Sequence, residues 1–538
     1  MSREAVRAVF DAVCTTKGYT YTYGTAGFRD KAAVLDTVMF ATGCVAVLRS
    51  WRLNGAQVGV MVTASHNPPE DNGVKVVDPE GGMLPEQWEP LATRLANLAA
   101  NGTFDQWWEY WTSLVEEGNY TGGARLCVGH DTRESSPRLL KNLMDAALAV
   151  SGGSITISKP WITNHPQLHY LTSLQRDGVT DAAAYNDHFQ GCWQKLFPDG
   201  VVAWPFDRLF IDTANGVGAV QLQQFFKGWA VDQNKFRLLN TDYGTPENLN
   251  VKCGADFVKT NHRLPSEVPD QRGTSGALPD LYCSFDGDAD RIVFYFVKNK
   301  QFHLLDGDKI STLFAKFIGQ LTARAGADDK LTVGVVQTAY ANGNSTRYIA
   351  SELGIPSACT KTGVKHLHHV AKTQYDIGIY FEANGHGTVV FSDKFNEVVA
   401  GVASTNDAAS TLYHFSKLIN QTVGDAIADM LGVLAVLIKL QWTPEVWGAE
   451  YTDLPNLLTK VVVPDRSIFE TTDQERRLVS PEGLQEKIDA CVGRFKRARS
   501  FVRASGTENA VRIYCEAEDP QEVQELSKQV TEAVLNSV

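Results

Sequence analysis

Three aspartates at alternate positions could together hold a metal ion. They lie in Phe285–Arg291 (FDGDADR), which follows the apolar run Leu281–Cys283. Three carboxylates so close together repel one another unless a cation holds them, which argues against a plain solvated turn. A calcium loop of the EF-hand type would need Gly at its sixth position and Glu at its twelfth, where Arg291 and Val297 stand. The stretch therefore predicts a Mg²⁺ site formed by Asp286, Asp288 and Asp290, and a phosphoryl oxygen that completes it could also pair with Arg291.

A second stretch, Thr63–Val76 (TASHNPPEDNGVKV), presents Ser65 after the apolar run Val58–Val62. A serine hydroxyl is a weak nucleophile unless a base or a phosphoryl group changes its role. Ser, Asn and Pro are also common in ordinary turns, so a turn without chemistry is an open alternative here. We expect the two prolines to stiffen the loop and Asn72-Gly73 to turn the chain, so that Lys75 returns toward Ser65.

Two more polar stretches are suited to binding a sugar phosphate. In Phe381–Gly387 (FEANGHG), alternate side chains can face one side of a loop and bind sugar hydroxyls, although a polar turn is the more common explanation. These side chains are Glu382, Asn384 and His386. In Arg503–Asn509 (RASGTEN), a bidentate arginine, two hydroxyls and the backbone around a glycine suit a phosphate. The residues expected to bind it are Arg503, Ser505, Gly506 and Thr507, with Arg512 just beyond.

A basic run lies upstream of this phosphate stretch. We expect Arg494, Lys496, Arg497 and Arg499 to form a solvated helix face. Taken together, a serine, a cation loop, a polyol loop and a phosphate clamp are the parts that phosphoryl transfer on a sugar phosphate requires. Their spread along the chain predicts a cleft between domains.

The helices and strands expected around these loops are typical of an α/β protein. Apolar strand-like runs alternate with helical patterns, and several end in polar, Gly-rich turns, where the ligand groups of α/β proteins lie. The expected strands are 58–62, 126–129, 209–212, 281–285, 332–337 and 377–381. A long helical pattern begins near Val423 and is expected to stop at Pro444. Beyond it, the strands at 460–463 and 511–516 and a helix from Pro520 predict a separate α+β domain.

Composition narrows the class of protein. The chain has 538 residues, 43% hydrophobic and 21% charged, which is ordinary globular composition with material for several domains. A net charge of -12 argues against nucleic-acid binding. Nine scattered cysteines, none at C-x-x-C spacing, fit a reducing compartment. The N-terminal residues lack the apolar core of a signal peptide, and the longest apolar run, 430–438, is too short to span a bilayer. We expect a cytoplasmic protein without membrane or nucleic-acid partners.

With these motifs in their order, the sequence resembles the α-D-phosphohexomutase superfamily. TASHNP is similar to its phosphoserine loop, DGDADR to its metal loop, FEANGHG to its sugar loop and RASGTEN to its phosphate loop. Further similar segments cover almost the whole chain, and three of the matches point to the branch that acts on N-acetylglucosamine. These three are FEANGHG, TGVKHLHH (362–369) and NQTVGDA (420–426).

The resemblance implies an α/β fold of four domains around a central cleft: three similar mixed-sheet α/β domains and a C-terminal α+β domain. The expected limits are 1–185, 186–298, 299–441 and 450–538. It also implies that Ser65 is a phosphoserine which, with the three aspartates, holds Mg²⁺. The phosphoryl group would pass to N-acetylglucosamine 6-phosphate, and a 1,6-bisphosphate intermediate, which also serves as activator, would yield the 1-phosphate for UDP-N-acetylglucosamine synthesis.

Other roles follow from the same resemblance. Arg29 and Lys75 match basic positions beside the reacting hydroxyl, and Lys75 or His66 is a candidate for proton transfer. Thr362 and Gly363 are candidates for substrate contact, whereas the nearby histidines at 366, 368 and 369 match no common zinc pattern and are expected to pack within a helix. A monomer or weak homodimer is expected.

Some features depart from the superfamily pattern. Ala504 stands where a proline is usual, which predicts a less rigid phosphate loop. Asn164-His165 stands where small residues or threonines are usual, in a segment that we expect to be structural. The open alternatives are a glucose or mannose phosphate mutase on the same scaffold, a catalytically inactive sugar-phosphate-binding protein, and a metal-dependent phosphatase.

Overall fold

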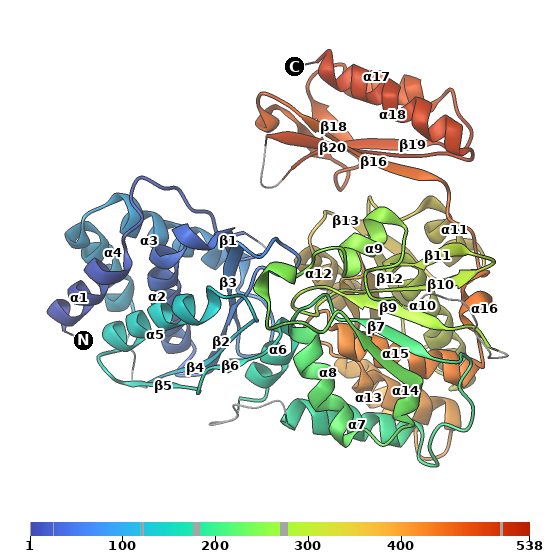
Figure 1. Ribbon diagram of the computed structural model, residues 1–538, viewed down its shortest axis with the longest axis horizontal. Helices are drawn as coiled ribbons and strands as arrows, with labels where there is room; N and C mark the ends of the chain where they lie inside the picture. Colours follow the sequence, from blue (N-terminus) through green and yellow to red (C-terminus); the bar gives the residue numbers. More distant parts are fainter. Residues whose placement is uncertain are drawn as a thin grey trace. The chain divides into compact units, whose positions relative to one another are not determined.

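The computed structural model describes residues 2–24, 26–118, 120, 123–175, 183–268, 278–505 and 509–537 (Figure 1). The chain forms two compact units: unit 1 comprises Met1–Leu304 and Lys417–Pro444, and unit 2 comprises Leu305–Ser416 and Glu445–Val538. Both are built from sheets covered by helices, as the sequence predicts. Within the described residues, no helix is long and apolar enough to cross a membrane.

The first sheet of unit 1 has the strand order β1-β3-β2-β4-β5, with β6 beside β4. Its strands are β1 (Phe28–Lys31), β2 (Gln57–Val62), β3 (Asp71–Val77), β4 (Ala124–His130), β5 (Ile155–Ile157) and β6 (Trp161–Ile162). Strand β2 runs parallel to β4 and antiparallel to β3. Val58, Val60 and Val62 of β2 join the main core, whereas Met61 packs with Leu168 in a separate cluster. The apolar run 58–62 therefore corresponds to a strand that is buried on both faces.

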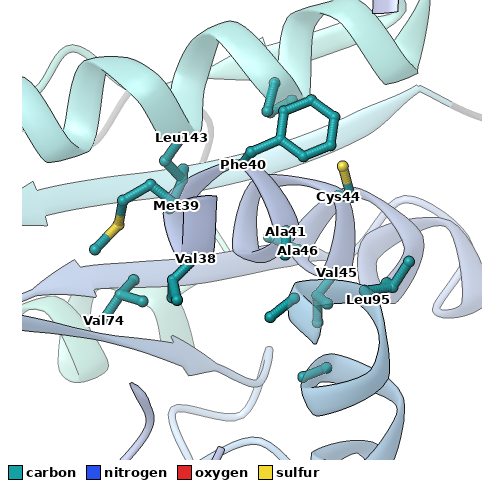
Figure 2. Packing of buried hydrophobic residues seen from close by; sticks show 14 of the residues in the cluster. Val38, Met39, Phe40, Ala41, Cys44, Val45, Ala46, Val74, Leu95 and Leu143 are labelled. Atoms are coloured by element: carbon teal, nitrogen blue, oxygen red, sulfur yellow. The ribbon is translucent and has the colours of Figure 1, made fainter. Parts of the chain in front are cut away.

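Helices cover this sheet. They are α1 (Arg3–Val13), α2 (Asp36–Arg52), α3 (Glu89–Asn101), α4 (Phe104–Glu116), α5 (Ser136–Ser151) and α6 (His165–Ser173). Figure 2 shows α2 residues such as Phe40 and Val45 in one buried cluster with Leu95 of α3 and Leu143 of α5. A Cβ atom on Gly43 would lie 2.4 Å from the Leu143 carbonyl oxygen, so glycine permits the close approach of α2 and α5.

A second sheet in this part of the chain has the order β11-β10-β9-β7-β8. Its strands are β7 (Leu209–Asp212), β8 (Phe236–Leu239), β9 (Leu281–Phe285), β10 (Ile292–Lys298) and β11 (Gln301–Leu305), and the helices here are α7 (Ala183–Leu196), α8 (Val217–Gly228), α9 (Ala255–Asn261) and α15 (Ala426–Leu440). The prediction that Pro444 stops the long helix is wrong. Helix α15 ends at Leu440, where Gln441 takes a left-handed conformation (φ 52), and Pro444 is the first residue of α16 (Pro444–Gly448), a position that suits proline.

Unit 2 contains a sheet of order β13-β12-β14-β15. The strands are β12 (Val333–Thr338), β13 (Ser357–Thr360), β14 (Ile377–Phe381) and β15 (Gly387–Phe391), and the helices are α10 (Gly307–Arg324), α11 (Gly343–Ser351), α12 (Val364–Gln374), α13 (Asp393–Ala400) and α14 (Asp407–Leu418). Leu367 and Ala371 of α12 pack on Val336 and Tyr380 of the sheet. His368 Nδ1 lies 3.0 Å from the Tyr380 hydroxyl, so this histidine does pack within the helix interface.

The C-terminal part of unit 2 is α+β, as predicted. An antiparallel sheet of order β16-β20-β19 and the hairpin β17-β18 accompany two helices. The elements are β16 (Asn456–Val462), β17 (Glu470–Thr472), β18 (Arg477–Ser480), α17 (Leu484–Val492), β19 (Arg499–Ala504), β20 (Ala510–Glu516) and α18 (Pro520–Leu535). Leu484, Val511 and Leu526 belong to the core between sheet and helices. The residue limits expected for the four domains stay a prediction.

Candidate active site

The serine loop begins where β2 ends. Ser65 is 2% exposed and has a left-handed backbone (φ 54), which is uncommon outside glycine and marks a constrained loop. Its backbone N–H donates to Thr63 Oγ1 at 3.1 Å. The chain turns through hydrogen bonds from Asn67 N to the Ala64 carbonyl and from Asp71 N to the Pro68 carbonyl.

The expected turn at Asn72-Gly73 is wrong, because both residues lie inside β3. Gly73 pairs with Arg29 of β1, and a Cβ atom there would lie 2.6 Å from the Phe28 carbonyl oxygen and 2.8 Å from that of Thr63. The glycine therefore permits close packing of neighbouring strands instead of a turn. Lys75 returns beside β2 as a strand residue, opposite Met61.

Arg133, which the sequence did not single out, holds the serine loop in shape. It follows β4 and is 1% exposed. Its guanidinium donates to the carbonyl oxygens of Ser65 (2.9 Å), Asn67 (3.0 Å) and Pro68 (2.7 Å), and to Asp131 Oδ2 at 3.0 Å. Because β2 and β4 are parallel neighbours, the chain after β4 lies at the same sheet edge as the serine loop. That adjacency is the signal that could have identified Arg133.

The aspartate loop lies against the serine. The Ser65 hydroxyl donates to Asp286 Oδ2 at 2.8 Å, and Asp286 Oδ1 accepts from the backbone N–H groups of Asp290 (3.1 Å) and Arg291 (3.2 Å). A Cβ atom on Gly287 would lie 2.6 Å from the Ser65 carbonyl oxygen, so the two loops can approach this closely because residue 287 is glycine. The structure therefore brings the predicted nucleophile and the predicted metal loop together.

The carboxylates of this loop have the chemistry of a cation site. Asp286, Asp288 and Asp290 are each at most 1% exposed. Burial, followed by the neighbouring carboxylates, raises the pKa of Asp286 well above its usual value and that of Asp288 to about 6. Among the described residues, Asp288 Oδ1 has no hydrogen-bond partner although it is buried. A divalent cation would satisfy this oxygen and stabilise the ionised carboxylates, so the residues fit Mg²⁺.

Four cationic or titratable side chains surround the loop. Burial lowers the pKa of Lys75, and also that of Arg29, whose Nη1 donates to Asn67 Oδ1 at 3.1 Å. Lys75 Nζ makes no hydrogen bond or ion pair within the described part of the chain. Arg291 pairs with Asp256 at 3.1 Å, an acidic partner that the sequence did not reveal. The positive charge of Arg291, followed by burial, lowers the pKa of His66 to about 3, so His66 is neutral near pH 7.

His165 is a further residue at the metal loop. Asn164 caps α6 by accepting a hydrogen bond from Gln167 N at 3.0 Å, a structural role as expected. His165 Nδ1, however, lies 3.5 Å from Asp290 Oδ2. His165, Asp288 and Asp290 offer ligand atoms within 4.8 Å of one another. The expected structural role of this segment is observed for Asn164 and stays a prediction for His165.

The sugar loop in unit 2 is a turn between β14 and β15. Glu382 N donates to the His386 carbonyl at 2.8 Å, and Asn384 Oδ1 accepts from His386 N at 3.0 Å. Glu382 Oε1 accepts from Gly363 N at 3.2 Å, which brings together two of the predicted substrate-binding segments. His386 is 6% exposed, whereas Glu382 and Asn384 are half-buried.

The phosphate stretch begins in the last two residues of β19, where Arg503 pairs in register with Arg512 of β20. Ser505 N donates to the Ala510 carbonyl at 2.8 Å. Gly506 and Thr507 lie outside the described residues. Arg503 Nε donates to Glu475 Oε1 at 2.8 Å, and Glu475 Oε2 accepts from Thr362 N (2.9 Å) and Thr362 Oγ1 (2.6 Å). Glu475, at the tip of the β17-β18 hairpin, thus connects two predicted ligand-binding residues, and no local sequence signal marked it.

The basic run upstream does not form a helix face, because α17 ends at Val492 and Arg494, Lys496 and Arg497 lie in turns beyond it. Arg499 is the first residue of β19, and it donates to the carbonyl oxygens of Ala339 (2.8 Å) and Ala341 (2.7 Å) and pairs with Glu516 at 3.1 Å. The expected helix is therefore wrong for all four residues. Arg494, Lys496 and Arg497 are exposed as expected, whereas Arg499 lies in a strand and pairs with a buried acid, features that depend on tertiary contacts.

The predicted site residues thus form two groups. Arg29, Ser65, His66, Lys75, the three aspartates and Arg291 converge in unit 1. Thr362, Gly363, Glu382, Asn384, His386, Arg503, Ser505 and Arg512 belong to unit 2. A cleft between domains stays a prediction.

Four protein-family models match the chain. Residues 26–101 match phosphoglucomutase/phosphomannomutase, alpha/beta/alpha domain I, and residues 458–533 match the C-terminal domain of the same proteins. Residues 177–293 and 306–442 match domains II and III of phosphoacetylglucosamine mutase AMG1.

Curated relatives and solved structures agree with these models. The chain is 50% identical to phosphoacetylglucosamine mutase of Saccharomyces cerevisiae, over 99% of this chain and 98% of that protein. It is 43% identical to the Homo sapiens enzyme, over 96% and 94%. A crystal structure of N-acetylglucosamine-phosphate mutase in a product complex superposes with a TM-score of 0.92 at 46% identity, covering 99% of this chain and 100% of that chain. The Aspergillus fumigatus enzyme in complex with GlcNAc-6P and magnesium gives a TM-score of 0.90 at 43% identity, with 99% of both chains covered. The chain belongs to the phosphoacetylglucosamine mutase family of the α-D-phosphohexomutase superfamily.

Proposed function

We propose that the protein interconverts N-acetylglucosamine 6-phosphate and N-acetylglucosamine 1-phosphate, with Mg²⁺ as cofactor and a sugar 1,6-bisphosphate as intermediate and activator. The single observation that carries this function is the contact between the buried hydroxyl of Ser65 and Asp286 at 2.8 Å. It supports the proposal because a phosphoryl carrier at Ser65 would lie beside a buried cluster of carboxylates that fits Mg²⁺. The family supports the sugar, because its members act on N-acetylglucosamine phosphates.

Phosphoryl transfer breaks the bond between phosphorus and Ser65 Oγ and forms one between phosphorus and the sugar hydroxyl oxygen. The sugar hydroxyl loses its proton, and Ser65 regains one when it leaves. Asp286, Asp288 and Asp290 would hold Mg²⁺ together with the serine-bound phosphoryl group. Bound there, Mg²⁺ supplies positive charge that stabilises the transferring phosphoryl group.

Lys75 is the better candidate for the proton transfer. Burial lowers the pKa of Lys75, which makes its amine a more effective proton acceptor, and the charges of Asp290 and Asp288 oppose this shift. His66, with a pKa of about 3, is a weak base near pH 7. Arg29 and Arg291 would offset the negative charge of the phosphoryl group.

The residues of unit 2 would bind the remainder of the substrate. Glu382, Asn384 and His386 would contact sugar hydroxyls, with Thr362 and Gly363 beside them. Arg503, Ser505, Gly506, Thr507 and Arg512 would bind the phosphate that is not reacting, which would hold the other end of the sugar in line with Ser65. A cytoplasmic location, a place in UDP-N-acetylglucosamine synthesis, and a monomer or weak homodimer belong to the same proposal.

The test is ³¹P NMR on the purified protein with Mg²⁺ and a catalytic amount of glucose 1,6-bisphosphate. Separate tubes receive the 6-phosphates of N-acetylglucosamine, glucose and mannose. We expect N-acetylglucosamine 1-phosphate to form fastest, Ser65→Ala to abolish its formation, and the exposed-serine control Ser113→Ala to retain it. Faster conversion of glucose or mannose phosphate would overturn the assignment of the sugar. Release of inorganic phosphate alone would identify a phosphatase, and no reaction would favour a binding protein.

A further inference from the structure

His165 lies in a fully buried position between a second histidine and the aspartate loop. It is the first residue of α6 and is 1% exposed, and His169, one turn further along the helix, is 0% exposed. The two Nε2 atoms are 2.6 Å apart, and His169 Nδ1 lies 2.6 Å from the Gly81 carbonyl oxygen. The other ring nitrogen of His165, Nδ1, faces Asp290 Oδ2 at 3.5 Å.

If both rings are neutral, the chain of contacts fixes the hydrogen on each nitrogen. A carbonyl oxygen can only accept, so His169 Nδ1 must carry a hydrogen and donate to Gly81. A neutral ring with hydrogen on Nδ1 has a lone pair on Nε2, so His169 accepts and His165 Nε2 donates. In the neutral form of His165, the lone pair then belongs to Nδ1, the atom that faces Asp290.

A nitrogen lone pair directed at a carboxylate oxygen is unfavourable unless a proton or a metal ion lies between them. Here a nitrogen and two carboxylates offer ligand atoms within 4.8 Å of one another, and all three residues are buried. The unsatisfied buried oxygen Asp288 Oδ1 points independently to a missing cation. Two ligands about 2.1 Å from one ion lie ~3.4 Å apart in a tetrahedral shell and ~3.0 Å apart in an octahedral one, so the 3.5 Å separation is compatible with a shared ion.

We propose that His165 Nδ1 is a nitrogen ligand of the divalent-cation site, together with Asp288 and Asp290, and that it raises the affinity of this site for Co²⁺ and Zn²⁺ relative to Mg²⁺. The inference rests on the metal site of the proposed function and extends its ligand set. Imidazole favours borderline ions such as Zn²⁺, whereas carboxylates suit Mg²⁺, so a mixed set binds ions that an all-oxygen set binds less well. His169 is a positioning residue, because its hydrogen bond fixes the tautomer and orientation of His165.

The direct test is pulsed EPR on the full chain, dephosphorylated and loaded with one equivalent of Mn²⁺. We expect ¹⁴N modulation from a histidine nitrogen in the wild type, its loss in His165→Thr, and its retention in the matched control His303→Thr, whose ring stacks on Phe296. Bound Mn²⁺ without ¹⁴N modulation, or modulation that survives in His165→Thr, would overturn the ligand assignment. Failure of the wild type to bind Mn²⁺ at all would instead refute the metal site of the proposed function.

Calorimetric titrations with Co²⁺, Zn²⁺ and Mg²⁺ separate a ligand from a structural residue. For His165→Thr we expect affinity for Co²⁺ and Zn²⁺ to fall at least about tenfold and affinity for Mg²⁺ to change by less than about threefold. An equal loss for all three ions would indicate a general disturbance of the loop and contradict the proposal. The wild-type EPR spectrum needs no variant, so the ligand assignment is testable even if His165→Thr folds poorly.

Discussion

Replacing Arg133 with lysine tests whether the serine loop is held in shape from outside the loop. Arg133 makes four side-chain hydrogen bonds: three to loop carbonyl oxygens and one to Asp131. A lysine keeps the charge, but its single nitrogen cannot reach acceptors placed around a planar guanidinium. If two of the four bonds are lost, at about 1.5–3 kcal/mol for a bond to a charged donor, the loop loses roughly 3–6 kcal/mol before it relaxes. After relaxation, we expect its opening free energy to fall by about 2–4 kcal/mol.

Hydrogen exchange measured by mass spectrometry on peptides covering residues 63–71 reports this local free energy. The matched control is Arg138→Lys, because Arg138 is about half exposed and pairs with Asp36 at the surface, so we expect less than about 1 kcal/mol there. Turnover of Arg133→Lys should fall at least about tenfold, since a misplaced nucleophile loses the benefit of alignment. Unchanged exchange in the loop, or an effect equal to that of Arg138→Lys, would refute the view that Arg133 shapes the site.

Three other substitutions test separate parts of the structure. Lys75→Met should lower turnover by about two to four decades while mass spectrometry still detects phosphate on Ser65 after incubation with bisphosphate, and unchanged turnover would remove Lys75 from the mechanism. Glu475→Gln should raise the KM for sugar phosphate about three- to tenfold with a smaller change in kcat, because Arg503 and Thr362 lose a charged acceptor, and an unchanged KM would contradict this. His368→Gln should remove a pH-dependent loss of stability. Burial lowers the pKa of His368 to about 4, so between pH 6.5 and pH 4 the unfolded chain binds the proton more readily than the folded chain. The free energy of unfolding therefore decreases as the pH is lowered through this range, by at most about 3 kcal/mol. Denaturant titrations at pH 7 and pH 5 should show a smaller difference for the variant than for the wild type.

The strands and the loops that follow them were predictable because their signals are local. A short apolar run bounded by polar, Gly-rich residues describes a buried strand, and β2, β9 and β14 all begin and end close to the predicted positions. The meaning of Asn72-Gly73 was not predictable in the same way. This dipeptide is a strong turn signal, yet Gly73 is needed for close packing in β3, so tertiary packing overrides the local preference.

Residues whose contacts lie far away in the sequence were not predicted, for a related reason. Glu475 reaches Thr362 and Arg503 from the tip of a hairpin, where three successive residues have positive φ angles between 49 and 69°. Such contacts depend on how the hairpin lies on the neighbouring sheet, which no periodicity in the sequence describes. The sequence predicts a structural role for Asn164-His165, and nothing local in that segment indicates that His165 lies beside Asp290.

In each unit, an arginine donates hydrogen bonds to the backbone of a loop that follows a strand. Arg133 does so for the serine loop after β2 and is balanced by Asp131, and Arg499 does so for the chain after β12 and is balanced by Glu516. A guanidinium suits this task because it bonds several carbonyl oxygens at fixed angles, and the adjacent carboxylate offsets the loss of solvation. Neither arginine was predicted to touch the substrate. The shape of these loops is therefore determined by residues other than those proposed for the chemistry, so substitutions at Arg133 and Arg499 can change loop rigidity while the proposed ligands and nucleophile stay in place.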